Sequence, residues 1–210
     1  MATTILLIRH GETVGNREGL FRGQKDFPLN ENGKIQAKAL AEELQAWKID
    51  AIHSSPLSRA MQTARPLADL QGLPVIEEPG FTNIHLADWE GVAKKWVEEN
   101  QPALWKVWVS EPERLRRPGA ETLAQVQERA FSALEKIVRN EVGKTVVVVS
   151  HRAVLKPLIA RCLDIPAPYF WKIHMDTAAY SIFEHTPERG YTLTLLNQTR
   201  HLQEFVREMV

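Results

Sequence analysis

Two histidines stand directly after short aliphatic runs that predict buried β-strands. His10 follows Arg9 at the end of an Ile-Leu-Leu-Ile run, and His151 follows a run of four valines and a serine. Ligands of α/β proteins bind at the carboxyl ends of parallel strands, and neutral imidazole is a competent nucleophile near neutral pH. Gly11 lets the backbone turn tightly here and lets a ligand approach it closely. His10 is therefore a candidate nucleophile.

Two arginines accompany these histidines. Arg9 precedes His10, and Arg59 lies where the short strand ending at residue 54 turns into a helix. Neighbouring strand ends lie within reach of one another, and the planar guanidinium fork binds tetrahedral oxyanions through two hydrogen bonds. A lone histidine at a strand end is more often structural, but four such groups at strand or helix edges favour function. The predicted ligand is a phosphate group.

The order of elements predicts an α/β protein with helices on both faces of its sheet. The unbroken β-branched run before His151 is typical of a central strand buried on both faces. The last two strands form a hairpin, which makes the mostly parallel sheet a mixed one and the fold a three-layer α/β/α arrangement. The expected strands are residues 3–9, 50–54, 75–77, 145–150, 179–184 and 191–196, and the expected helices are residues 30–47, 58–70, 121–142 and 154–163.

The least regular part of the chain, residues 78–120, is expected to be a helical lid over the strand ends. Its tryptophans favour satellite packing over a binding role. Its arginines are as consistent with a solvent-exposed surface as with a site that binds an anion. The residues concerned are Trp96, Trp105, Trp108, Arg114, Arg116 and Arg117.

Composition excludes several other classes of protein. The 210 residues fit one domain, and 26 Lys and Arg balance 26 Asp and Glu, so no net field steers nucleic acid or an anionic membrane. The single cysteine, Cys162, excludes an internal disulfide and is expected to be buried. Neither a signal-peptide pattern nor a membrane-spanning run is visible, so a cytoplasmic location is expected.

Blocks spread over nearly the whole chain resemble, in family order, the histidine phosphatase (phosphoglycerate mutase-like) superfamily. They lie at residues 8–16, 54–64, 84–91, 118–122 and 149–151. The likeness is greatest to the cofactor-independent phosphatases, which include broad-specificity, α-ribazole and metal-independent phosphoserine phosphatases. It implies a phosphoglycerate mutase-like fold and a single domain over residues 1–210.

The resemblance also implies roles for individual residues. His10 would take the phosphoryl group, while Arg9, Arg59 and His151 would hold its oxygens with the help of Asn16. Three further residues would line the phosphate or substrate loop. Fixed cations would replace Mg²⁺, so neither a metal nor another cofactor is expected. The loop residues are Arg22, Gly23 and Gln24.

One position departs from the family pattern in a way that bears on catalysis. A glutamate usually protonates the leaving oxygen, and its place here is taken by Asn83, whose amide is neither a workable acid nor a base. A neighbour such as His85, Asp88 or Glu90 would supply the proton, or substrates have good leaving groups, or the chain is an impaired or engineered variant. Lesser departures are Gly15, Ala87, Ala120 and Arg152.

Three functions remain open from the sequence. The preferred one is a metal-independent phosphatase that acts on a small phosphorylated metabolite and releases inorganic phosphate. The alternatives are a phosphoglycerate mutase-type transferase and a phosphate-ligand binding protein that has lost turnover. No nucleic acid or membrane partner is expected, and the last hairpin could support a homodimer. The sequence does not name the substrate.

Overall fold

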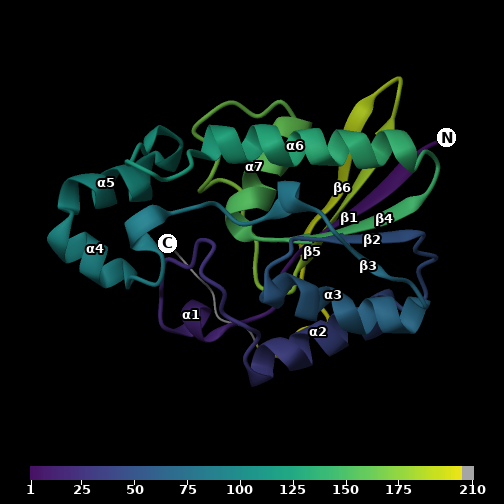
Figure 1. Cartoon of the computed structure of the whole chain (residues 1–210). Helices are drawn as coiled ribbons and strands as arrows, with labels where there is room; N and C mark the ends of the chain where they lie inside the picture. Colours follow the sequence, from purple (N-terminus) through teal and green to yellow (C-terminus); the bar gives the residue numbers. More distant parts are fainter. Residues whose placement is uncertain (205–210) are drawn as a thin grey trace.

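The computed structural model describes residues 1–204 and contains a six-stranded mixed sheet (Figure 1). The strand order is β3-β2-β4-β1-β5-β6, with the first four parallel and the last two forming an antiparallel hairpin beside β1. The predicted mixed sheet is therefore confirmed. The strands are β1 (Thr3–Arg9), β2 (Ala51–Ser54), β3 (Val75–Glu77), β4 (Thr145–Ser150), β5 (Tyr180–Thr186) and β6 (Gly190–Gln198).

Helices cover both faces of this sheet, which confirms the three-layer α/β/α arrangement (Figure 1). Leu6 and Ile8 of β1 face the layer formed by α2 (Glu31–Leu44) and α3 (Ser58–Gln71). Ile5 and Leu7 face the opposite layer, formed by α6 (Leu123–Asn140) and α7 (Arg152–Cys162). Because side chains alternate along a strand, β1 and β4 need apolar residues at every position to fill both cores.

The helix after His151 begins two residues earlier than expected. His151 is extended and serves as the N-cap of α7, so that Arg152 rather than Val154 is the first helical residue. Histidine and arginine are not among the residue types preferred at a helix N-cap, so no local pattern indicated that the helix begins here. The shift places Arg152 beside the strand end.

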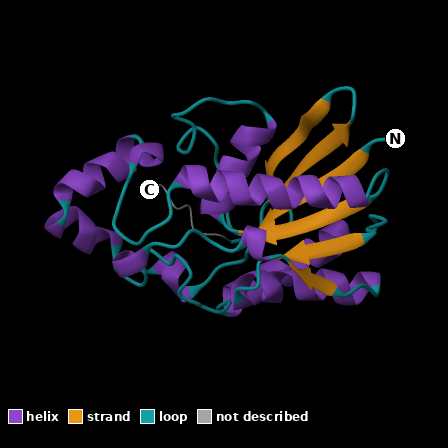
Figure 2. Cartoon of the chain, turned by 45° about the horizontal axis from the view of Figure 1, so that its top comes forward, coloured by secondary structure: helices purple, strands orange, loops and turns teal. Residues whose placement is uncertain are grey.

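Residues 78–120 extend beyond the carboxyl ends of the parallel strands, as Figure 2 shows. They contain the short helices η1 (Pro79–Phe81), η2 (Ala87–Trp89), α4 (Lys94–Asn100), α5 (Pro102–Ser110) and η3 (Pro112–Arg114). Trp108 packs with its ring centre 5.2 Å from that of Phe21. Arg117 stacks on the Trp89 ring and pairs with Asp88 instead of clamping an anion at the strand ends.

Between β1 and α2 lies a short helix that the sequence analysis did not predict. This helix, α1 (Val14–Arg17), begins with a capping box. The Asn16 side-chain oxygen accepts hydrogen bonds from the backbone N–H and the hydroxyl of Thr13. Asn16 therefore has a local structural role, whatever else it does.

Two further expectations concern burial. Cys162 is a free, buried cysteine, as predicted, and burial raises the pKa of its thiol well above the usual range. No helix within residues 1–204 is long and apolar enough to cross a membrane.

Candidate active site

His10 lies at the carboxyl end of β1, and its backbone fixes its place between two strands. Its N–H donates to the Ser150 carbonyl at 2.9 Å, and its carbonyl accepts from the Ala178 N–H at 3.1 Å. The ring Nδ1 lies 2.7 Å from the Gly11 carbonyl oxygen. A carbonyl only accepts hydrogen bonds, so Nδ1 carries the proton and Nε2 keeps its lone pair. This tautomer leaves the Nε2 lone pair without a proton.

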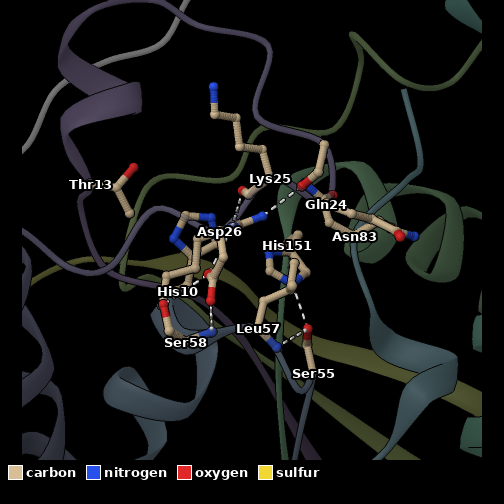
Figure 3. A network of polar contacts seen from close by, with 12 residues as sticks. His10, Thr13, Gln24, Lys25, Asp26, Ser55, Leu57, Ser58, Asn83 and His151 are labelled. Carbon is tan, nitrogen blue, oxygen red and sulfur yellow. Dashed lines mark hydrogen bonds and ion pairs between the residues drawn. The ribbon is translucent and has the colours of Figure 1, made fainter. Parts of the chain in front are cut away.

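His151 brings a second imidazole to the same place from the end of β4. The two ring centres lie 5.1 Å apart (Figure 3). His151 Nε2 pairs with the Ser55 hydroxyl at 2.7 Å, while Nδ1 is buried without a hydrogen-bond partner among the described residues. Because buried polar atoms are rarely left unpaired, Nδ1 is suited to meet a ligand.

Both rings open into a cavity of about 440 Å³, counting the space at its mouth. Its wall combines aromatic side chains with ionisable and polar groups, and no carboxylate occurs among the described residues that line it. The polar members of this wall are His10, Arg22, Asn83, Lys94, His151 and Arg152.

Arg9 and Arg59 are buried beside the histidines, although neither is among the described residues that line the cavity. Arg9 donates to the Met175 carbonyl at 2.7 Å. Arg59 donates to the Gly23 carbonyl at 2.8 Å and to the Lys25 carbonyl at 3.1 Å. Burial lowers the pKa of Arg59 to about 9, which leaves its guanidinium charged at neutral pH. Both arginines therefore contribute positive potential at the rings.

Asn83 also lines the cavity, at 7% exposure. Its amide nitrogen donates to the Gly23 carbonyl at 2.8 Å, and its Oδ1 is buried with no partner in the part of the chain described. A side chain on Gly23 would collide with Glu90, and the φ of +51° at this position also favours glycine. Position 83, where the resemblance leads us to expect a proton donor, thus carries a buried amide. This amide is hydrogen-bonded to Gly23, a position at which a larger residue would not fit.

Burial holds the two histidine rings in their neutral form. Burial, and after it the charge of Arg59, keeps the pKa of His10 and of His151 well below the usual value of 6.5. Neutral His10 therefore stays available as a nucleophile below pH 6.5, whereas an ordinary histidine would be protonated there.

The same shifts predict that acid destabilises the fold. Between the depressed folded pKa values and about 6.5, the unfolded chain binds more protons than the folded one, so stability falls as pH falls through this window. Each such histidine adds a slope of about 1.4 kcal/mol per pH unit. We expect the melting temperature to drop steadily from about pH 7.5 to about pH 5.5.

The measurement is thermal unfolding of the wild type and of His151→Asn across this pH range. The variant should show a shallower slope, whatever its absolute melting temperature. His10, His53 and His201, whose pKa values burial also lowers, supply the part of the slope that remains. Identical slopes in the two proteins would contradict the assignment.

Besides Arg9 and Arg59, four other residues expected at the site lie outside the described lining of the cavity. Gly11 faces the Gly33 carbonyl, which a Cβ would approach to 2.8 Å, so its small size serves chain packing. Gln24 bonds through its amide to the Asn83 carbonyl at 3.0 Å. The His85 ring, 44% exposed, pairs with Glu90 at 3.1 Å. The fourth is Asn16, in its capping box.

Other lining residues were not expected from the sequence. Lys94 comes from α4, Trp108 from α5, and Phe170 from the segment after α7. Only their placement in three dimensions reveals them, because none belongs to a motif that carries chemistry. Arg152 was visible beside His151 in the sequence, without a sign of which way it points.

The fold and the two imidazole rings define an α/β protein with a cavity lined by basic side chains at the carboxyl edge of its sheet. Residues 5–199 match the model of the histidine phosphatase superfamily, branch 1, and the chain belongs to this family. It is a phosphomonoester hydrolase.

Individual relatives agree with this assignment. Phosphoserine phosphatase 1 of Hydrogenobacter thermophilus is 37% identical over 204 residues, which cover 97% of this chain and 96% of that protein. The YhfR structure of Bacillus stearothermophilus superposes with a TM-score of 0.91 at 31% identity, over 96% of this chain and 100% of that one. The 2-carboxy-D-arabinitol-1-phosphatase of Triticum aestivum is 31% identical over 94% of this chain, which spans 41% of its length.

Proposed function

We propose that this protein hydrolyses a small phosphomonoester without a metal, through a phosphohistidine intermediate on His10. The observation that carries the proposal is the tautomer of His10. Its proton is held on Nδ1 by the Gly11 carbonyl, which leaves the Nε2 lone pair free to attack at neutral pH.

The proposed reaction has two displacements at phosphorus. His10 Nε2 forms a bond to phosphorus as the bond from phosphorus to the ester oxygen breaks, and the ester oxygen takes a proton from a water molecule and leaves as the alcohol. A second water then attacks phosphorus and gives up a proton to solvent, the bond to Nε2 breaks, and inorganic phosphate leaves. Charge on the transferring oxygens is balanced by Arg9, Arg22 and Arg59, whose fields already act on His10.

His151 is proposed to hold an oxygen of the transferring group. When the Ser55 hydroxyl donates to its Nε2, the ring proton sits on Nδ1, the atom that has no described partner. A donor in this place stabilises negative charge in the transition state without any rearrangement.

Named activities of the relatives suggest where a substrate search should begin. One acts on phosphoserine and the other on a sugar-acid phosphate, by their names. Both compounds carry a carboxylate beside the phosphate. We therefore propose a phosphorylated small acid as the first substrate to test, with residues 1–210 acting as one domain.

The test is release of inorganic phosphate from phosphoserine and p-nitrophenyl phosphate in the presence of a chelator. We expect multiple turnovers without metal and without any bisphosphoglycerate primer. Dependence on the primer would favour a mutase instead. Phosphate binding without turnover would favour a binding protein, the alternative that Asn83 raises.

A further inference from the structure

Besides Arg22, two further cations line the cavity. Arg152 comes from α7, and Lys94 comes from α4 in the segment beyond the strand ends. These two residues lie in separate elements far apart in the chain, so they are not part of one local motif. The two histidine rings are neutral, so the positive potential of the cavity comes from the arginines and Lys94.

Arg152 is built into this wall and is only 8% exposed. Its guanidinium carbon lies 5.6 Å from the centre of the Trp171 ring. The indole is itself fixed, because its Nε1 donates to the Trp108 carbonyl at 2.9 Å. An arginine stacked on a fixed aromatic ring loses little further freedom when it binds a ligand.

The segment that supports Arg152 is held by the lid. The Glu113 carboxylate accepts from the backbone N–H groups of Tyr169 at 2.6 Å and Phe170 at 2.7 Å. One turn along α7, Lys156 donates to the Phe170 carbonyl at 2.9 Å, and its ammonium lies 5.0 Å from the Trp171 ring. A second buried cation next to the first raises the positive potential at this end of the cavity.

We propose that Arg152, assisted by Lys94, binds a carboxylate of the substrate while the phosphate group lies at His10. The preferred substrates are then phosphomonoesters with a carboxylate a few bonds from the phosphate. Guanidinium binds carboxylate through two parallel hydrogen bonds, and Arg152 lines the same cavity as the His10 ring. The inference rests on the proposed phosphatase function and names its specificity-determining residue.

The test compares 3-phosphoglycerate with glycerol 3-phosphate, which differ by a carboxylate in place of a hydroxymethyl group. We expect the wild type to favour 3-phosphoglycerate by at least about tenfold in kcat/KM. Arg152→Gln should lower kcat/KM for 3-phosphoglycerate by about 10- to 100-fold, mainly through KM, and change that for glycerol 3-phosphate by less than about threefold.

Two further variants separate charge from structure. Arg161→Gln removes an arginine from the same helix that stacks on Phe131 instead, and it should leave both substrates unaffected. Arg152→Lys keeps the charge but loses the fork, so it should fall between wild type and Arg152→Gln. If Arg152→Gln does not fold, the Arg152→Lys variant still tests the inference.

Equal losses on both substrates, or no preference in the wild type, would overturn the inference. Failure of the proposed function gives a different result, which is no phosphate release from either compound by the wild type. The same comparison is then made by calorimetric binding of the two ligands. Weaker binding of 3-phosphoglycerate alone in Arg152→Gln would support the inference, and equal binding by both proteins would overturn it.

Discussion

His10→Ala should abolish phosphatase activity, with kcat for p-nitrophenyl phosphate reduced by at least about 10³-fold. The substitution removes the Nε2 lone pair that is proposed to attack phosphorus. Assistance from a bound metal or a second nucleophile would have to replace it, and His151 has its Nε2 engaged by Ser55. Steady-state release of p-nitrophenol is the measurement.

A matched control comes from the other end of the same sheet. His185 lies on β5 opposite Thr3, at the amino end of β1, and its ring contacts Tyr191. His185→Ala should keep nearly full activity. His10→Ala should remain folded by circular dichroism and still bind vanadate weakly, since the guanidinium groups are intact. Activity retained in folded His10→Ala would contradict the assigned nucleophile.

The second large effect on activity is expected at Asn83, the amide that stands where related enzymes usually have a glutamate. Asn83→Glu should raise kcat/KM for alkyl phosphates by about 10²-fold, and for aryl phosphates by less than about threefold. An alkoxide is a poor leaving group that needs a proton, whereas a nitrophenolate leaves without one. Asn83 lines the same cavity as His10, Arg22 and His151, so a carboxyl at this position would lie at the proposed site of reaction.

Asn83→Gln is the matched control, because it has the length of glutamate without the acid. Its rates should stay near wild type or fall on both substrate classes. If Asn83→Glu improves alkyl and aryl phosphates equally, or improves neither, proton donation does not limit this enzyme. A neighbouring group would then already supply the proton to the leaving oxygen. The His85 ring, paired with Glu90 outside the described cavity lining, is not placed for it.

The fold could be predicted largely because its signals are local. The aliphatic run before His10 and the valines before His151 are buried on both faces, and only the centre of a sheet provides such a place. The hairpin of the last two strands makes the sheet mixed, as was predicted. Helix starts were less certain. His151 caps α7 although its type rarely does so, and Asn16 takes part in the capping box of a helix that was not predicted.

The site was predictable where strand ends deliver side chains, and not where the lid does. The rings of His10 and His151 meet because β1 and β4 are adjacent and parallel. Lys94, Trp108 and Phe170 reach the cavity through tertiary packing that no local pattern encodes. Gly11 was expected to allow close approach of a ligand. In the structure its lack of a side chain allows close packing against Gly33.

The central claim is that a phosphoryl group passes through the ring at position 10. Its most direct test mixes the enzyme rapidly with excess p-nitrophenyl phosphate, quenches in alkali and maps the modified peptide by mass spectrometry. We predict one phosphoryl group on His10, stable in alkali and lost in acid, as expected for a bond from phosphorus to nitrogen. Turnover with no covalent phosphate, or phosphate on another residue, would contradict the account.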